Sequence, residues 1–257
     1  MKQGQRLWTR EELILTINLY CKVPFGKLHR SNPDVIHLAK LIDRTPNSVA
    51  YKLVNFASFD PSLRARGIRG AENSSKLDLE IWNEFFNNWD ILPFESEKLL
   101  AKYQNTTVEV TNKIDASEIT REGRERNQIV KVRVNQYFFR ATVLASYNNT
   151  CCITGLKNPE LLIAGHIRPW GLDEKNRLNP RNGIALNALH DRAFELGIIT
   201  ILPSYKIKIS SVLKKQAKST SIKNYFLRYE NKEIILPSRF LPDADFLEYH
   251  NKERFKP

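Results

Sequence analysis

Two neighbouring segments, LLIAGHIRPW (residues 161–170) and RNGIALNALHDRAFELG (residues 181–197), decide the fold of the C-terminal half. The first is an apolar run that predicts a strand ending near His166, because the proline that follows cannot extend a strand ladder. The second predicts a short strand after Asn182 and then a short helix that carries His190. A β-hairpin packed on that helix would bring two imidazoles and one carboxamide to one place.

These three side chains suit the hydrolysis of a phosphodiester. The neutral imidazole of His166 can take a proton from water near pH 7. A second imidazole on the helix, at His190, can bind a divalent metal ion that neutralises the phosphate and the departing oxygen. The amide of Asn182 can hold the first histidine in one tautomer or pin the hairpin. We therefore expect a catalytic site at the end of this hairpin.

Each of these residues also has an ordinary structural interpretation. A histidine such as His166, taken alone, is more often a core or turn residue, and Asn182 before a glycine would serve any tight turn. Their combination with His190 favours the catalytic interpretation. No catalytic role is expected for the remaining histidines: His37 in an amphipathic helix, His29 in a basic loop, and His250, which is expected to pack or to bind backbone groups.

Composition indicates a globular protein with a polyanionic partner. The chain has 257 residues and a net charge of +12. Residues 126–257 hold 22 Lys and Arg against 11 Asp and Glu, whereas residues 1–125 hold 18 against 17. A basic excess in one half favours nucleic acid as the partner, although a solubilising surface would have the same charge. Three cysteines without a CxxC pair, and no apolar stretch long enough for a membrane, predict a cytoplasmic protein.

The N-terminal segment predicts capped helices. Thr9 is a candidate N-cap, and Asn32 and Thr45 each precede a proline at the first helical position. The second and third helices form a helix-turn-helix pattern, which serves either DNA recognition or docking on the rest of the protein. In this pattern the exposed side of the third helix would carry Asn47, Ser48, Tyr51, Lys52 and Asn55. We take Asn47 and Lys52 as candidate DNA contacts.

The separated motifs C-x-I-T-G, A-G-H-I-x-P-W and N-G-I-A-L-x-x-x-L-H-x-x-x-F-x-x-G resemble the HNH endonucleases, which have the ββα-metal fold. The similarity is closest to the subgroup found in bacterial restriction-type proteins, and it covers roughly residues 128–257. The N-terminal half is similar to accessory domains found beside such nucleases, and this weaker likeness implies no mechanism.

The resemblance implies a role for each site residue. It makes His166 the general base on the attacking water, Asn182 the residue that supports the loop and orients the base, and His190 a metal ligand. The metal would be divalent, with Mg²⁺ favoured and Mn²⁺ or another ion as alternatives. Arg168 and Arg192 are candidates for phosphate contact, and they serve equally well as ordinary surface arginines.

Gly165 departs from the family pattern. Many HNH enzymes carry Asp or His immediately before the general base, and that residue is a metal ligand. Replacements could come from Asp191, Glu195 or Asp173, or from water. On an ideal helix neither Asp191 nor Glu195 faces the same way as His190, because neighbours on one face are three or four residues apart.

These observations predict an α+β protein with a C-terminal ββα-metal nuclease domain at residues 128–257. A mainly helical N-terminal module at 1–95 and a linker at 96–127 would precede it. We expect a metal-dependent DNA endonuclease of restriction or defence type, with a homodimer as one possible assembly. The alternatives are a non-catalytic DNA-binding or regulatory protein on an HNH scaffold and an RNA-cleaving nuclease of toxin type.

Overall fold

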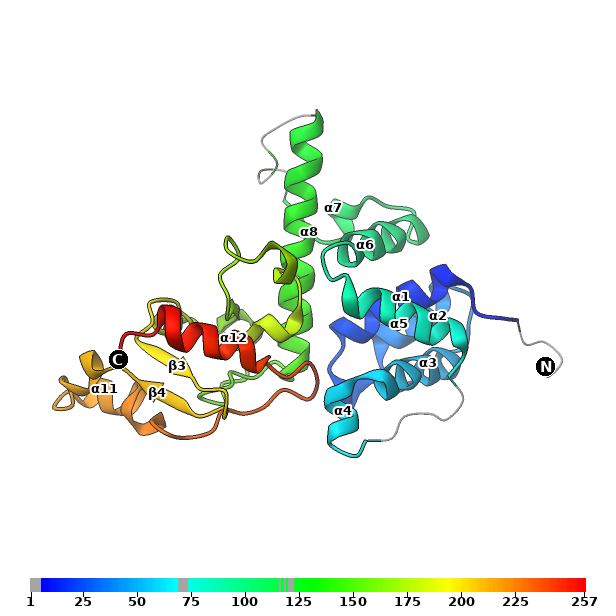
Figure 1. Cartoon of the computed structure of the whole chain (residues 1–257). Helices are drawn as coiled ribbons and strands as arrows, with labels where there is room; N and C mark the ends of the chain where they lie inside the picture. Colours follow the sequence, from blue (N-terminus) through cyan, green and yellow to red (C-terminus); the bar gives the residue numbers. More distant parts are fainter. Residues whose placement is uncertain (1–5, 69–73, 116, 118, 120–122) are drawn as a thin grey trace. The chain divides into compact units, whose positions relative to one another are not determined.

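The computed structural model (Figure 1) describes residues 6–68, 74–115, 117, 119 and 123–257. The chain divides into two compact units, Met1–Ala141 and Thr142–Pro257. The described part of unit 1 is helical, and unit 2 holds two small antiparallel sheets together with helices. The fold is therefore α+β with a helical N-terminal region, as predicted. None of the described helices is both long and apolar enough to cross a membrane.

Side-chain caps define where the helices of unit 1 begin. Thr9 forms a capping box with Glu12, and Asn32 and Thr45 accept hydrogen bonds from the first turns of the next two helices, as predicted. A turn with Asp43 at φ 50° separates these two helices. The helices are α1 (Arg10–Lys22), α2 (Pro33–Leu41), α3 (Pro46–Phe59), α4 (Pro61–Ala65), α5 (Lys76–Asn87), α6 (Leu92–Tyr103), α7 (Val108–Thr111) and α8 (Gly123–Ser146).

An aromatic cluster holds α1, α3 and α5 together. The Trp82 ring lies 5.8 Å from Tyr20 and 6.4 Å from Phe56 between ring centroids, and all three side chains are buried. Phe85 is buried as well, so the aromatic face of α5 belongs to the core, and Trp89, which follows the helix, is also buried.

The predicted linker at residues 96–127 differs from the structure, in which the division between units falls after Ala141, inside α8. The segment holds most of α6 and all of α7. Ile114 and Ile119 are buried with apolar side chains of α8 in one cluster. A few apolar residues thus pack this segment onto α8, although its composition is mostly polar.

The predicted exposed side of α3 is only partly correct. Asn47 and Tyr51 are exposed, whereas Lys52 and Asn55 are buried. The Lys52 ammonium bonds both carboxylate oxygens of Asp78, at 2.8 and 2.7 Å. This geometry contradicts the prediction that Lys52 contacts DNA. The buried carboxylate of Asp78, from α5, neutralises the charge of the Lys52 ammonium.

Replacing Lys52 with methionine is expected to destabilise the protein by about 3–5 kcal/mol, because it leaves the buried carboxylate of Asp78 without its cation. Burial alone would raise the pKa of Asp78, but hydrogen bonds from Lys52 and Ser75 outweigh it and lower that pKa. The contribution of the Lys52–Asp78 pair to the free energy of unfolding is therefore present at neutral pH, and it is lost as the pH falls through the lowered pKa of Asp78. Urea unfolding measures it, with exposed Lys76→Met as control; equal losses in both variants would contradict the prediction.

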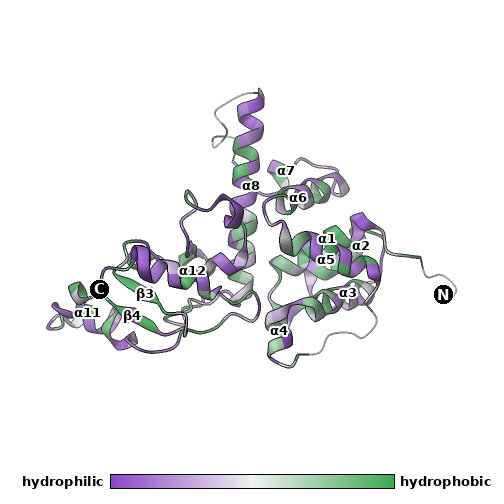
Figure 2. Cartoon of the chain, in the orientation of Figure 1, coloured by the Kyte–Doolittle hydropathy of each residue, from purple (hydrophilic) through white to green (hydrophobic). Residues whose placement is uncertain are grey.

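Unit 2 is built around two short hairpins. Strand β1 (Leu162–His166) pairs antiparallel with β2 (Gly183–Asn187), with His166 opposite Gly183. Helix α9 (Ala188–Glu195) follows β2 directly. The second hairpin, of β3 (Ile199–Ile201) and β4 (Ile207–Ile209), is mostly apolar in Figure 2 and is buried except at Lys208. The remaining helices are α10 (Ser211–Lys214), α11 (Thr220–Tyr225), α12 (Ala244–Tyr249) and the π-helix η7 (His250–Arg254).

Close packing explains the glycine at position 197, and backbone hydrogen bonds hold residues 151–155. Gly197 ends α9 at φ 71°, and a Cβ there would lie 1.9 Å from the Arg254 carbonyl oxygen. Residues 151–155 form a turn whose backbone hydrogen-bonds to neighbouring segments as a strand would. The Cys152 amide donates to the Ala185 oxygen, and its carbonyl accepts from Ile235.

Candidate functional site

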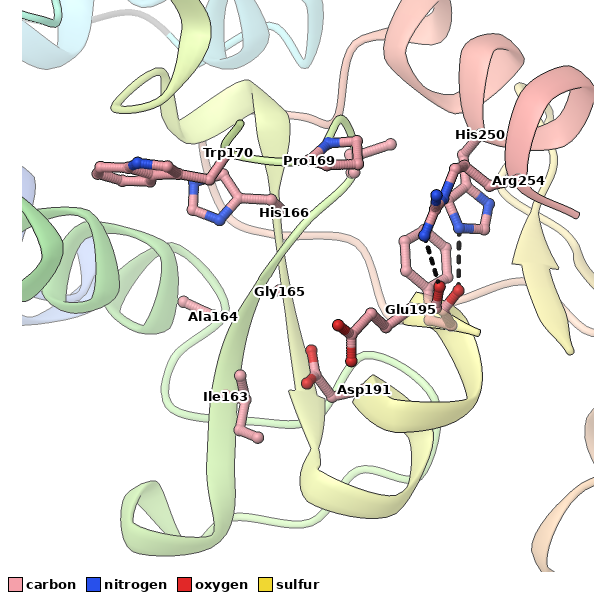
Figure 3. Close-up of a pocket in the computed structure, with 12 residues that line it drawn as sticks. Ile163, Ala164, Gly165, His166, Pro169, Trp170, Asp191, Glu195, His250 and Arg254 are labelled. Atoms are coloured by element: carbon pink, nitrogen blue, oxygen red, sulfur yellow. Dashed lines mark hydrogen bonds between the residues drawn. The ribbon is translucent and has the colours of Figure 1, made fainter. Parts of the chain in front are cut away.

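A pocket of about 350 Å³ lies between the end of β1 and one side of α9 (Figure 3). Its lining includes Gly165 and His166 from β1, and Asp191 and Glu195 from α9. Successive side chains of a strand point to opposite faces. In Figure 3, accordingly, His166 lies beside Trp170 on one side of β1, and the two carboxylates lie on the other. The imidazole and the carboxylates therefore flank the strand end.

A backbone carbonyl fixes the tautomer of His166. Its Nε2 lies 2.8 Å from the Arg177 oxygen. A carbonyl only accepts, so Nε2 carries the proton and the lone pair of the neutral ring is on Nδ1. Burial lowers the pKa of His166, against the opposing effect of this hydrogen bond. The ring is therefore neutral at pH 7, and its Nδ1 is the basic atom.

Asn182 holds the loop that supplies this carbonyl. Its side chain is fully buried, and its Oδ1 accepts from the Arg168 amide at 2.8 Å. Its Nδ2 donates to the carbonyl oxygens of Arg168 and Asn176, both at 3.2 Å. These bonds tie the two ends of the loop between Arg168 and Asn176 to the start of β2. Asn182 thus acts on His166 through the loop backbone.

The structure does not bring His190 to the pocket. Its ring is buried, with Nε2 2.7 Å from the Tyr225 carbonyl oxygen and Nδ1 3.0 Å from Asn187 Oδ1. Its neighbours are the rings of Phe226 and Tyr229. The metal-ligand role expected for His190 therefore has no support in this geometry, because the imidazole does not line the pocket and instead ties α9 to later segments.

Asp191 lies beside Gly165, the position at which many HNH enzymes carry a metal ligand. A Cβ added at Gly165 would lie only 2.5 Å from Asp191 Oδ1, so the glycine leaves room for this carboxylate. Asp191 and Glu195 are four residues apart and share one face of α9. Burial, and then the negative charge of Glu195, raise the pKa of Asp191 to about 6.

Residues 151–202 match the family model described as HNH endonuclease. We call this matched segment the HNH domain. It contains β1, β2, α9 and β3, and with them His166, Asn182, Asp191 and Glu195. No curated protein matches the chain. An HNH domain indicates a nuclease. The pocket at the end of β1 is therefore its candidate active site.

The carboxylates of the HNH domain fit a hard divalent cation. Asp191 and Glu195 offer oxygen ligands, and burial together with the charge of Glu195 disfavours the ionised form of Asp191, which a bound cation would favour. In the described part of the chain, no three His, Cys, Asp or Glu side chains are grouped so that they could hold a metal. A cation bound by two carboxylates would keep several water ligands, as Mg²⁺ does in many proteins.

The arginines predicted to contact phosphate are paired with acids. Arg168 bonds Asp173 at 3.0 Å and lies over the Tyr249 ring, and Arg192 bonds Glu195 at 2.7 Å in an exposed pair. Asp173, a suggested metal ligand, is thus engaged by Arg168. Neither arginine lines the pocket, whereas Arg254 does.

The π-helix η7 supports the far end of α9, which the sequence did not predict as part of the site. His250 donates to the Phe194 carbonyl oxygen at 3.1 Å, and Arg254 donates to the Glu195 carbonyl oxygen at 3.1 Å (Figure 3). Burial lowers the pKa of His250 to about 4, so this ring is neutral. No short-range pattern could have revealed these contacts, because 56 and 59 residues separate the partners.

Replacing Gly165 with alanine is expected to displace the Asp191 carboxylate and to lower the cleavage rate by up to about 10²-fold, because misplacing a site group by about 1 Å can cost that much. Stability should change little, since the clash involves the end of a side chain. The cleavage rate and the melting temperature would be compared with those of Gly171→Ala, where an added Cβ meets nothing within 4 Å. Equal rates for both variants would contradict the prediction.

Proposed function

We propose that this protein is a divalent-metal-dependent DNA endonuclease that hydrolyses phosphodiester bonds. One observation carries the proposal: a half-buried histidine with its lone pair on Nδ1 lies at a pocket whose helical wall carries two carboxylates. A general base on one side of the strand end and oxygen ligands for a cation on the other supply the two functions that hydrolysis of a phosphodiester uses.

In the proposed reaction His166 Nδ1 accepts a proton from the attacking water, and the Arg177 carbonyl stabilises the ring as it becomes positive. The water oxygen bonds to phosphorus and the bond to the 3′ oxygen breaks, which leaves a 5′-phosphate. Asp191 and Glu195 would hold the cation, which when bound supplies positive charge at the phosphate and the departing oxygen. Asn182 and His190 are positioning residues, the first for the loop and the second for α9.

DNA is the proposed substrate because the basic excess lies in the half of the chain that contains the HNH domain. Polyphosphate backbones bind such surfaces through counterion release. The resemblance to restriction-type proteins supports a role in restriction or defence. A reducing, cytoplasmic setting is part of the proposal, since Cys21, Cys151 and Cys152 are buried and form no disulfide in the described part of the chain.

Cleavage assays with purified protein test the proposal. Plasmid DNA and a structured RNA would be incubated with the protein in Mg²⁺, Mn²⁺ or EDTA. The expected result is cutting of DNA that stops in EDTA. Cutting of RNA alone would favour a toxin-type nuclease, and DNA binding without any cutting would favour a regulatory protein.

Cleavage is expected to increase with pH between about 5 and 7. The raised pKa of Asp191, about 6, means that protons compete with the cation below that value. Burial lowers the pKa of His166 below its ordinary value, so the base does not add a separate rise above pH 7. Initial rates at fixed Mg²⁺ over this pH range measure the effect. A flat profile, or one that rises only above pH 8, would contradict the assignment.

A further inference from the structure

Unit 1 contains a second pocket, of about 880 Å³. The proposed hydrolysis of DNA by the HNH domain does not use it. Asn47, Tyr51 and Asn55 lie four residues apart along α3 and line it together. Arg6 and Arg44 also line it. One wall therefore combines amides and an aromatic ring, and guanidinium groups lie close to them.

A buried hydrogen-bond acceptor at this wall lacks a donor. Asn55 is 1% exposed, and its Nδ2 donates to Asp78 Oδ2 at 3.0 Å. Because a carboxylate only accepts, this bond fixes the orientation of the amide. The opposite atom, Asn55 Oδ1, is buried with no hydrogen-bond partner. Since a buried acceptor without a donor costs free energy, a ligand with an N–H or O–H group would be favoured there.

The charges around the pocket leave an excess of positive charge. Arg6 and Arg44 both bond the single carboxylate of Glu12, at 2.6 and 2.8 Å. Lys52 and Asp78 neutralise each other. Three cations thus face two carboxylates in this group, which leaves one positive charge. The 14-residue helix α3 begins beside the pocket and adds the positive end of its dipole. An anionic group would therefore be attracted here.

Tyr51 provides an aromatic surface between the charged groups and the amide of Asn55. Its side chain is 47% exposed and also lines the pocket. An aromatic ring, an acceptor without a donor and a nearby excess of positive charge match the base and the phosphate of one nucleotide. Every nucleobase carries an N–H donor, which fits Asn55 Oδ1.

We propose that this pocket binds a single unstacked nucleotide of DNA, with its base against Tyr51, an N–H of the base donating to Asn55 Oδ1 and its phosphate near Arg6 and Arg44. The inference rests on the proposed function only in taking DNA as the ligand. Unit 1 would then recognise DNA through a base that is taken out of the stack. This mode differs from the predicted helix-turn-helix contact through Lys52.

Binding of labelled duplexes to the full-length protein in EDTA tests the inference without cleavage. Because a mismatched base is easier to unstack, the wild type should bind a duplex with one mismatch about tenfold more tightly than the paired duplex. Tyr51→Ala and Asn55→Leu should lose this preference, measured by fluorescence anisotropy. Tyr137→Ala, which removes another exposed tyrosine of unit 1, should keep it.

Equal affinity of the wild type for both duplexes would overturn the inference, as would a preference that survives in the Tyr51→Ala protein. Calorimetric titration with dAMP distinguishes a nucleotide that is part of DNA from a free nucleotide. Binding of dAMP without any mismatch preference would assign the pocket to a free nucleotide and overturn the DNA site. A mismatch preference in a protein that never cuts DNA would support this pocket and reject the proposed endonuclease.

Discussion

Replacing His166 with alanine is expected to lower the rate of DNA cleavage by a factor of about 10²–10⁴, which is the usual contribution of a positioned general base. The imidazole is held as the neutral Nε2–H tautomer by the Arg177 carbonyl and lines the pocket, whereas His190, the other histidine of the HNH domain, does not line it. Initial rates on plasmid DNA at saturating Mg²⁺ measure the effect. DNA affinity in EDTA should remain within about twofold, because the ring is assigned to proton transfer.

The matched control is His37→Ala, which removes an exposed histidine of unit 1 that bonds Gln104. It should cut at the wild-type rate. Circular dichroism and the melting temperature of the His166 variant would show that the fold is intact. A His166→Ala protein that cuts as fast as the wild type would refute the general-base assignment.

The features that could be predicted from the sequence are those that depend on neighbours in the chain. The caps at Thr9, Asn32 and Thr45 each involve side chains and amides within three residues, so the residue types suffice to predict them. The hairpin of β1 and β2 follows from an apolar run and a turn at Asn182. The identification of the HNH motif is of the same kind, since its residues occur in order along 151–202.

The features that could not be predicted depend on partners far along the chain. Lys52 looks exposed on an isolated helix, but α5 brings Asp78 to it from 26 positions away. The choice between the two faces of α9 is a similar case. The helical geometry correctly separates His190 from Asp191, yet only the packing of Phe226 and Tyr229 on the imidazole shows which face turns to β1. Such long-range packing leaves no periodic signal.

Replacing Asp191 with asparagine is expected to raise the Mn²⁺ or Mg²⁺ concentration for half-maximal cleavage at least roughly 10–100-fold, a loss that even an outer partner of a metal ligand can cause. The charge of the carboxylate provides the attraction, and asparagine keeps its shape. Calorimetric titration of the protein with Mn²⁺ gives a readout that does not depend on activity. The same variant should also lose the increase in cleavage between pH 5 and 7, because the group with the raised pKa is gone.

His190→Asn is the comparison that decides which face of α9 holds the cation. Successive residues on a helix point about 100° apart, so one cation site cannot use both side chains in the observed packing. Loss of the imidazole leaves the Tyr225 carbonyl without its donor, and we expect the free energy of unfolding to fall by about 1–3 kcal/mol. Mn²⁺ affinity should stay at the wild-type value. If His190→Asn loses the metal and Asp191→Asn keeps it, α9 must rotate on binding, and the assignment of the carboxylates fails.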